Sequence, residues 1–299
     1  MANGKALNSG MRKILVTGAG GQLGSRLAEL AGSDRAMIFA LDRSELDITD
    51  PQSIARSLDR HQPHAVINAA AYTAVDRAES EPEMAHLING DGPGWLAAAC
   101  ASRGIDLVHI STDYVFDGMA QRAYLPSDNP SPQGAYAASK RAGEMRVAEA
   151  FAGATNANWW VIRVAWLYDV RGANFMQTMV RLGTSGKSLR VVDDQVGAPT
   201  AARPFADALL TLVTLEHPIP SGIWHYGTAG PTTWYGFARA IFSALGMHVE
   251  LAPCTTAEYP TPAKRPAFSY LDGTAFARAI GIPHVPWEEE LKNEIDRMK

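Results

Sequence analysis

The sequence lacks the features that mark several large classes of protein. Its 299 residues hold two cysteines, Cys100 and Cys254, which are far apart and form no Cys-x-x-Cys pair. This argues against a disulfide framework or a zinc ribbon and favours a reducing, cytoplasmic compartment. No apolar run approaches the roughly 18 residues of a membrane span, and the best candidate, 159–168, is interrupted by Arg163. With 27 Lys and Arg against 31 Asp and Glu, the net charge of -4 gives no basic footprint for nucleic acid.

What is present is enough apolar material for a folded core, since 46% of the residues are hydrophobic and 19% are charged. Residues 1–10 are small and polar and lack the apolar segment of a signal peptide. We expect them to form a flexible extension without a function, with Met11 as the functional start.

Short apolar runs alternate with segments of helical periodicity over the first 170 residues. Asp50 before Pro51 is typical of a helix start, because the carboxylate caps the helix and proline suits its first position. The alternation predicts an α/β fold with a Rossmann-type, doubly wound parallel sheet. We expect strands at 12–17, 36–41, 64–68, 105–111 and 159–168, and helices at 22–31, 51–61, 95–103 and 135–151.

After residue 170 the pattern loosens. We predict a dinucleotide-binding Rossmann domain over 11–170 and a smaller C-terminal α/β substrate-binding domain over 171–299, some segments of which return to the first domain. Five prolines between 260 and 286 indicate a loop-rich tail. Expected elements in this half are helices at 175–182, 205–215 and 234–245, and strands at 189–192 and near Trp224.

A glycine-rich turn separates the first strand from the first helix. Gly18 permits a tight turn, Gly21 lets the backbone approach a pyrophosphate, and Gly24 lets the helix pack close to the sheet. Asp42 follows 18 residues beyond Gly24, near the spacing of a ribose-binding carboxylate. The turn therefore predicts a dinucleotide site. Its further candidate residues are Gly20, Gln22 and Leu23.

The cofactor is left open by two neighbouring residues. Asp42 favours the free 2′-hydroxyl of NAD, whereas the guanidinium of Arg43 suits the 2′-phosphate of NADP. We expect NADPH, with NADH also accepted. Asp47 and Ile48, just beyond, are candidates for flanking the adenine.

Tyr136 and Lys140 lie four residues apart on a predicted helix and so share one face. An ammonium nearby lowers the pKa of a phenol, which suits tyrosine to proton transfer with a carbonyl oxygen. Ser111 and Thr112 end the fourth predicted strand, at the sheet edge where ligands bind in such folds. We expect Thr112 to hydrogen-bond the substrate carbonyl and Ser111 to contact the cofactor.

In combination these segments resemble the extended short-chain dehydrogenase/reductases and, within them, the dTDP-4-dehydrorhamnose reductase family. The resemblance runs from Met11 to nearly the end of the chain, and its more specific segments include Thr-Asp-Tyr-Val-Phe and Arg-Pro-x-x-Ser-x-Leu-Asp. The matching segments are 16–24, 67–83, 109–118, 136–144, 164–175, 191–200, 232–238 and 259–272.

The resemblance implies reduction of the C4 ketone of a dTDP-4-dehydro-6-deoxy sugar by NADPH or NADH. It implies Tyr136 as the proton donor, Lys140 as the ligand of the nicotinamide ribose and Thr112 as the third catalytic residue. Asp113 and Trp166 are then expected to contact the sugar. Further residues implied are Ala69, Ala70 and Ala71 along the cofactor and Arg265 at a nucleotide phosphate.

One departure from the family pattern concerns metal. Some members carry a glutamate after Gly-Ala-Pro-Thr that helps to bind Mg²⁺ at a dimer interface, whereas this chain has Arg203 in that region. Arginine does not ligate a hard cation. We therefore expect no metal site, and either a monomer or a homodimer.

Two alternatives stay open. The first is an epimerase or 4,6-dehydratase on the same scaffold, although Thr112-Asp113 replaces the Asp-Glu pair that a dehydratase needs. The second is a non-catalytic, dinucleotide-binding regulatory subunit resembling the methionine adenosyltransferase beta subunit.

Overall fold

The computed structural model describes residues 11–32 and 34–298, so the predicted extension 1–10 lies outside the described residues. Six parallel strands form the main sheet in the order β10-β5-β4-β3-β1-β2. The predicted doubly wound parallel sheet is confirmed. Its strands are β1 (Lys13–Thr17), β2 (Met37–Leu41), β3 (Ala65–Asn68), β4 (Asp106–Thr112), β5 (Trp159–Val164) and β10 (Gly222–His225).

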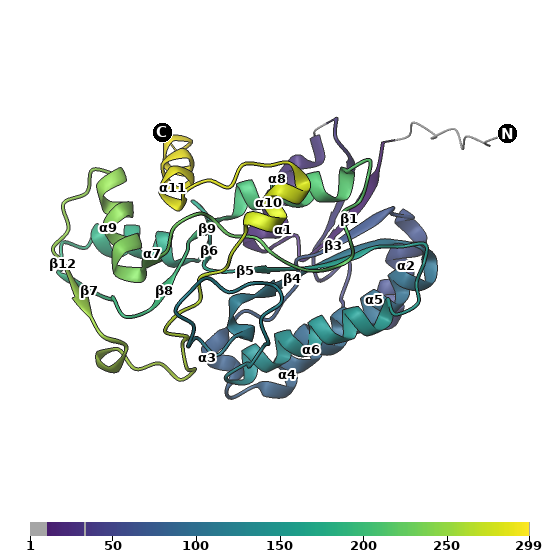
Figure 1. Ribbon diagram of the computed structural model, residues 1–299. Helices are drawn as coiled ribbons and strands as arrows, with labels where there is room; N and C mark the ends of the chain where they lie inside the picture. The colour runs from purple at the N-terminus through teal and green to yellow at the C-terminus, as the bar shows by residue number, and fades with distance from the viewer. Residues whose placement is uncertain (1–10, 33, 299) are drawn as a thin grey trace.

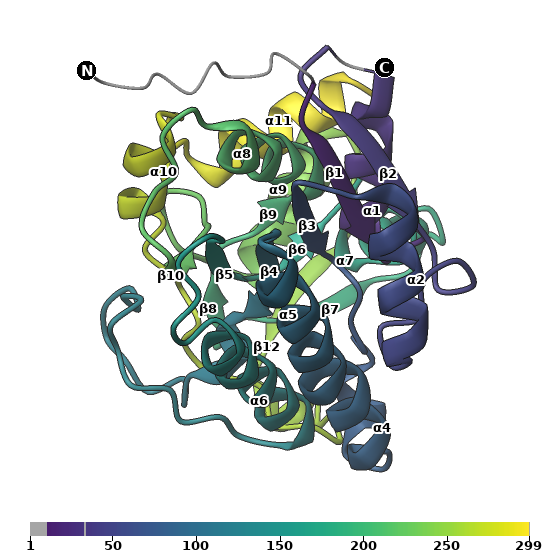
Figure 2. The ribbon, with the colours of Figure 1, turned by 90° about the vertical axis from the view of Figure 1, so that its right-hand side faces the viewer.

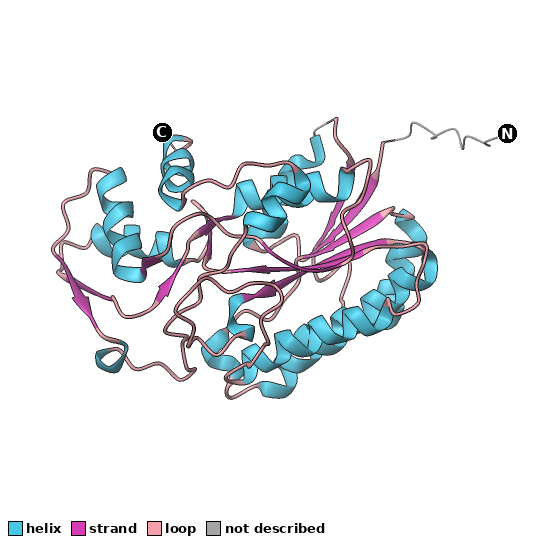
Figure 3. Ribbon diagram, in the orientation of Figure 1, coloured by secondary structure: helices cyan, strands magenta, loops and turns pink. Residues whose placement is uncertain are grey.

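Helices cover both faces of this sheet (Figures 1 and 3). One layer contains α2 (Pro51–His61), α5 (Gly92–Arg103) and α6 (Ala135–Ala150), and the other contains α1 (Gln22–Glu29), α8 (Ala202–Thr214) and α10 (Thr274–Ile280). Figure 2, turned by 90°, shows β3, β4 and β5 between α8 on one side and α5 and α6 on the other. The sheet is therefore buried on both faces, as a parallel sheet requires.

The burial of alternate strand residues explains the two layers. In β1, Ile14 and Val16 pack in the core cluster that contains Leu27 of α1, whereas Leu15 packs in the cluster that contains Leu58 of α2. Successive side chains of a strand point to opposite faces. Continuous apolar runs thus supply both cores at once, which is why they are the pattern of a central parallel strand.

A smaller region with short strand pairs lies beside the sheet, at the left of Figure 1. β7 pairs with β12 and β6 with β9 in parallel, while β8 pairs with β11 antiparallel. The predicted boundary near residue 170 stays a prediction, but β10 and α8 come from beyond it and lie in and against the main sheet. The elements here are β6 (Leu167–Tyr168), α7 (Phe175–Gly183), β7 (Leu189–Val192), β8 (Val196–Gly197), β9 (Thr200–Ala201), β11 (Thr232–Thr233), α9 (Trp234–Ala244), β12 (Leu251–Cys254) and α11 (Trp287–Asp296).

The predicted strand 159–168 is wrong in its second half. Trp166 has a left-handed backbone, with φ of 48°, and this turn ends β5 at Val164. From Leu167 the chain pairs with β9 instead of the main sheet. Tertiary contacts of the tryptophan hold the unusual backbone, and an apolar run carries no signal for such a turn.

The predicted loop-rich tail contains two helices. The first, α10, is capped by Gly281 in the left-handed conformation, and the second, α11, follows Pro286 with three glutamates in its first turn. Two prolines of this segment therefore lie at the ends of helices, with Pro283 after α10 and Pro286 before α11. The remaining short elements are the turns η1 (Leu30–Gly32), η3 (Asp113–Val115) and η4 (Thr256–Glu258), the helices α3 (Val75–Ala78) and α4 (Pro82–His86), and the π-helical turn η2 (Leu87–Asp91).

Candidate active site

The glycine-rich turn lies between β1 and α1, where β1 has β2 on one side and β3 on the other. Gly18 has φ of 69°, and a Cβ atom there would lie 2.8 Å from the backbone of Ala70. A Cβ atom on Gly24 would lie 2.1 Å from the carbonyl oxygen of Gly18. Both positions therefore exclude any larger residue, and the turn lies where the strand order reverses, the usual place of a dinucleotide crevice.

A cavity of about 210 Å³ opens beside this turn. Most of its lining residues are predicted cofactor residues, brought together from β1, β2 and β3. Leu46, Thr49 and Ile88 were missed by the sequence reasoning; the first two flank Asp47 and Ile48, and Ile88 comes from the π-helical turn η2, which carries no sequence signal. The full lining is Gly18, Gly21, Arg43, Leu46, Asp47, Ile48, Thr49, Ala69, Ala70, Ala71 and Ile88.

Arg43 lines this cavity, whereas the Asp42 carboxylate is engaged in its own turn. Oδ1 of Asp42 accepts hydrogen bonds from the backbone and hydroxyl of Ser44 at 2.8 and 2.6 Å and from Glu45 at 3.2 Å. The Ser44 hydrogen bonds lower the pKa of Asp42. Arg43 pairs with Asp47 at 3.2 Å. The geometry thus offers a guanidinium, in preference to a carboxylate, to the end of a bound dinucleotide.

The start of α1 is suited to an anion. Gly21 is its N-cap residue and makes no side-chain capping hydrogen bond, so the first N–H groups of the helix keep their capacity for a phosphate. Leu23 is buried in the core, and the Oε1 atom of Gln22 is buried without a hydrogen-bond partner among the described residues. Leu23 can therefore contribute only its backbone to such a site.

Thr112, Tyr136 and Lys140 converge at the carboxyl end of β4. The hydroxyl of Thr112 lies close enough to the phenol of Tyr136 to lower its pKa. It donates to Asp113 at 2.9 Å and accepts from the backbone of Tyr114 at 3.2 Å. The rings of Tyr114 and Tyr136 meet edge to face, with centroids 5.5 Å apart. The structure therefore brings the three predicted catalytic residues together.

The pKa values of this group differ from the sequence-based expectation. Burial raises the pKa of Tyr136, with Asp113 and Tyr114 adding to the effect and the Thr112 hydrogen bond opposing it. Burial lowers the pKa of Lys140 to about 8 and raises that of Asp113 to about 6. The ammonium of Lys140 donates to the backbone oxygen of Ile110 at 2.6 Å. In this state Tyr136 is a protonated phenol, the form that a proton donor needs at neutral pH.

Asn89, which the sequence reasoning missed, connects the cavity to the catalytic helix. Its side chain bonds both backbone groups of Tyr72, at 2.8 and 3.0 Å, and donates to the hydroxyl of Ser139 at 3.0 Å. Tyr72 directly follows the three cavity-lining alanines, and Ser139 directly precedes Lys140. Because Asn89 lies in the π-helical turn, only the tertiary structure reveals this link.

The predicted sugar contacts come from two segments, Asp113 after β4 and Trp166 after β5. Asp113 is buried, and its Oδ2 atom has no hydrogen-bond partner among the described residues. Trp166 stacks on Trp234, with ring centroids 3.6 Å apart, and packs against Gly197, where a Cβ atom would lie 2.6 Å from the indole. The Trp166 side chain is half-buried in this packing.

Arg265 reaches the same region from the C-terminal loop. It pairs with Asp76 of α3 at 2.7 Å and lies close to Tyr114, and its Nη1 atom is buried without a hydrogen-bond partner among the described residues. Its backbone neighbour Ala263 donates to the same Asp76 carboxylate at 3.1 Å. Asp76 therefore holds this loop beside Tyr114, with one guanidinium nitrogen left for a ligand.

Within residues 11–32 and 34–298, no cluster of three or more metal-ligating side chains occurs. Arg203 lies 3.5 Å from Glu29 and 3.8 Å from Glu294, so it pairs with two carboxylates. The same described part of the chain has no helix long and apolar enough to cross a membrane.

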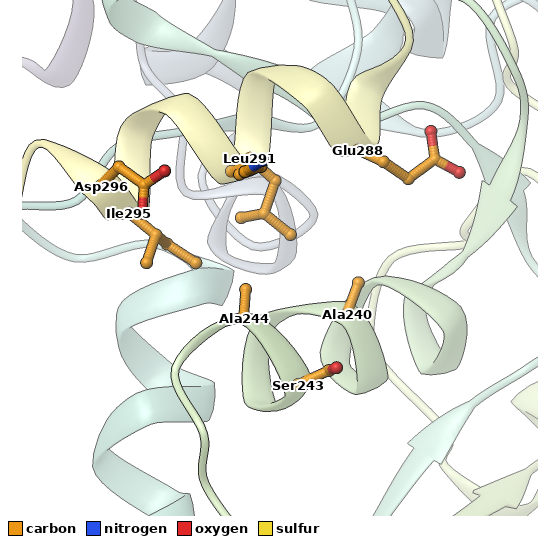
Figure 4. Close-up of a pocket in the computed structure, with 8 residues that line it drawn as sticks. Ala240, Ser243, Ala244, Glu288, Leu291, Ile295 and Asp296 are labelled. Atoms are coloured by element: carbon orange, nitrogen blue, oxygen red, sulfur yellow. The ribbon is translucent and has the colours of Figure 1, made fainter.

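A second hollow, of about 370 Å³, lies between α9 and α11 (Figure 4). Its walls are formed by Ala240 and Ala244 of α9 and by Leu291 and Ile295 of α11. The lining comes from these two helices alone, away from the predicted catalytic and cofactor residues.

Comparisons with known proteins agree with this geometry. A family model described as "RmlD substrate binding domain" matches residues 11–299. A dTDP-4-dehydrorhamnose reductase of Burkholderia thailandensis is 42% identical over 289 residues, which cover 92% of this chain and 95% of that protein.

Two solved structures are similar over almost the whole chain. A dTDP-4-dehydrorhamnose reductase from Clostridium acetobutylicum has a TM-score of 0.88 at 38% identity and covers 96% of this chain and 99% of its own. One from Bacillus anthracis, in complex with NADP, has a TM-score of 0.88 at 36% identity and covers 96% of this chain and 100% of its own.

Proposed function

Because the chain belongs to the dTDP-4-dehydrorhamnose reductase family, we propose that it reduces the C4 ketone of dTDP-4-dehydro-6-deoxy-L-mannose to dTDP-L-rhamnose. This is the last step of dTDP-rhamnose biosynthesis, with NAD(P)H as the reductant. The observation that carries the proposal is the convergence of Thr112, Tyr136 and Lys140 at the carboxyl end of β4, on the same edge of the parallel sheet as the glycine turn. The two unpaired cysteines fit a cytoplasmic enzyme.

The residues of the cavity fit a dinucleotide. Gly18 and Gly24 clear the space that a Cβ atom would fill, and the uncapped start of α1 suits a pyrophosphate. When bound, the reduced nicotinamide supplies the hydride that the ketone carbon needs. Arg43 faces the cavity while Asp42 is engaged elsewhere, which supports NADPH as the preferred form.

Three side chains handle the proton. Thr112 orients the carbonyl of the substrate by a hydrogen bond, and the protonated hydroxyl of Tyr136 donates its proton to the carbonyl oxygen. The ammonium of Lys140 stabilises the phenolate that remains. Burial of Tyr136 suits this direction of reaction, since its raised pKa keeps the proton available until negative charge develops on the substrate oxygen.

Two partnerless polar atoms are suited to the sugar nucleotide. Oδ2 of Asp113 is placed to accept a hydrogen bond from a sugar hydroxyl, and Nη1 of Arg265 to donate to the diphosphate. The edge of Trp166 would complete the sugar site. We thus propose Asp113, Arg265 and Trp166 as the residues that bind the sugar nucleotide.

Replacing Tyr136 by phenylalanine tests the proposal. Tyr136→Phe removes the proton donor and is expected to lower kcat by at least about 100-fold, while the affinity for NADPH stays within a factor of about three. The measurement is the loss of NADPH absorbance with the product of the preceding pathway enzymes, together with NADPH fluorescence for binding.

Tyr168→Phe is the matched control. The Tyr168 hydroxyl is buried without a hydrogen-bond partner among the described residues, so its loss is expected to leave kcat near the wild-type value. Near-normal turnover of Tyr136→Phe would contradict the proposed role of the phenol.

The same assay separates the alternatives. An epimerase or dehydratase recycles bound NAD and consumes no NADPH, and a regulatory subunit binds NADPH without any turnover. Family membership favours the reductase over both.

A further inference from the structure

The catalytic helix α6 presents a third polar side chain on the face that carries the tyrosine and the lysine. Tyr136, Lys140 and Glu144 follow at intervals of four residues, so they lie one above the other along α6. Glu144 is buried, with 1% of its surface exposed. A carboxylate this deep is unfavourable unless donors surround it.

Four donors surround Glu144. The hydroxyl of Ser111 donates to Oε1 at 2.6 Å, and the guanidinium of Arg163 binds both carboxylate oxygens at 2.8 Å each. Arg141, from the same helix, donates to Oε2 at 2.9 Å. The Glu144–Arg163 pair is thus a buried, two-pronged ion pair, the arrangement with the strongest geometry for this type of interaction.

Together with Tyr136 and Lys140, Glu144 connects α6 to the end of β4. Lys140 donates to the backbone oxygen of Ile110, Glu144 accepts from the hydroxyl of Ser111, and Tyr136 lies beside the hydroxyl of Thr112. Each of three consecutive strand residues is therefore next to one of the three aligned residues of the helix. The spacing between the catalytic phenol, the ammonium and the strand end depends on all three contacts.

The contacts of Glu144 extend to the next strands of the sheet. Arg163 of β5 is the register partner of Ser111 in β4, so the Glu144 carboxylate spans two neighbouring strands. The Arg163 guanidinium lies 4.9 Å from the ring centre of Phe116 and 3.5 Å from Nε2 of His225 in β10. Glu144 consequently ties α6 to three strands.

We propose that Glu144 is a positioning residue of the reductase site, which fixes the strand end that carries Thr112 and sustains the ammonium of Lys140. The inference rests on the proposed function, in which Thr112, Tyr136 and Lys140 perform the proton transfer. It assigns to Glu144 a role through its neighbours and no contact with the substrate.

Charge supports the second part of this role. Burial lowers the pKa of Lys140 to about 8, and the negative charge of Glu144 opposes that effect. The other titratable group that faces the lysine is His109 of β4, whose pKa is lowered well below its usual value by burial and by Lys140 itself, so it stays neutral. The positive charges of Arg141 and Arg163 face Glu144. Removal of the carboxylate charge therefore leaves the ammonium less favoured.

The test is Glu144→Gln, which keeps an acceptor oxygen for Ser111 but removes the charge. The pH at which kcat falls on the alkaline side is expected to move down by about one unit, because the pKa of Lys140 falls by the same amount. At a pH well above 8, this lowers the fraction of Lys140 in the ammonium form by about tenfold. The affinity for NADPH, measured by fluorescence over the same pH range, is expected to show the same displacement without any turnover.

Asp169→Asn is the matched control, because Asp169 forms a comparably buried ion pair with Arg26 in another part of the molecule. Its pH profiles are expected to match the wild type. Glu144→Asp keeps the charge and shortens the side chain, so it is expected to lower kcat while the alkaline limb stays in place.

A uniform loss of activity in Glu144→Gln at every pH would overturn the proposal if the alkaline fall of kcat and that of NADPH affinity both stay at the wild-type pH. Glu144 would then be a purely structural residue. If Glu144→Gln fails to fold, Ser111→Ala is the second test. It removes the hydrogen bond between Ser111 and Glu144 and leaves the ion pair of Glu144 with Arg163 intact. An unchanged kcat in Ser111→Ala would then overturn the positioning role, and a loss of about tenfold or more at constant KM would support it. If the wild type binds NADPH but reduces no sugar nucleotide, the proposed function fails alone, because the NADPH-affinity profile still tests Glu144.

Discussion

Two adjacent side chains after β2, Asp42 and Arg43, lie differently with respect to the cavity. The sequence left the choice between Asp42 and Arg43 open, because either residue type suits one form of the cofactor. In the structure Asp42 accepts three hydrogen bonds within its own turn, while Arg43 lines the cavity. Local hydrogen bonds thus occupy one oxygen of the Asp42 carboxylate, and the cavity lining contains Arg43 but not Asp42.

Arg43→Ala is expected to weaken NADPH binding by about tenfold, the contribution of roughly one hydrogen bond to a charged group, and to leave NADH binding within about twofold. Fluorescence titration with both cofactors measures this. The control is Asp42→Asn, which is expected to leave NADPH binding near the wild-type value. Equal losses for NADPH and NADH in Arg43→Ala would contradict an interaction with the 2′-phosphate.

At the scale of an element, the junction between β1 and α1 shows packing overriding propensity. Alanine usually stabilises a helix by about 1 kcal/mol relative to glycine. At Gly24, in the first turn of α1, a Cβ atom would lie 2.1 Å from the carbonyl oxygen of Gly18. A backbone atom cannot move aside as a flexible side chain does, so the clash outweighs the propensity.

Gly24→Ala is therefore expected to lower the melting temperature in the absence of cofactor by several degrees, since overpacking costs about 1–3 kcal/mol. Gly20→Ala is the control, because a Cβ atom there has open space around it. A melting temperature of Gly24→Ala equal to that of Gly20→Ala would show that α1 can shift away from the turn.

For the whole molecule, the attachment of the C-terminal helix depends on a buried carboxyl group. Glu290 of α11 accepts a hydrogen bond from the backbone of Ala201 at 3.2 Å and so connects the end of the chain to the start of α8. Burial raises the pKa of Glu290 from 4.5 to about 7. The folded state thus holds this proton more tightly than the unfolded chain does. The stabilisation is complete below about pH 4.5 and is lost as the pH rises through 7.

Glu290→Gln is expected to raise the melting temperature by a few degrees at pH 8 and to change it little at pH 5, where the wild-type carboxyl is still protonated in the fold. Thermal melts at both values measure the difference. Exposed Glu288 provides the control, since Glu288→Gln is expected to shift both melts by less than about 1 °C. An equal gain at both pH values would contradict the role of the buried charge.

Patterns of local origin were sufficient for much of the fold and of the candidate site. The apolar runs predicted the positions of β1 to β4, and the Asp50-Pro51 pair predicted the start of α2. Asp50 caps that helix by accepting a 2.8 Å hydrogen bond from the backbone of Gln52. The spacing of Tyr136 and Lys140 placed both on one face of α6. Such features depend on residues that are close in the chain, so a single sequence contains them.

The amino-acid sequence by itself thus determined the doubly wound sheet, the glycine turn and the residue types of the catalytic group, because each follows from local periodicity, turn chemistry or spacing. Only the tertiary structure decided the left-handed turn at Trp166, the link from Asn89 to Ser139 and the hydrogen bonds of Ser111 and Arg163 to Glu144. Those contacts join segments far apart in the chain. Their existence depends on burial and on which strands become neighbours, and no local pattern of residues carries that information.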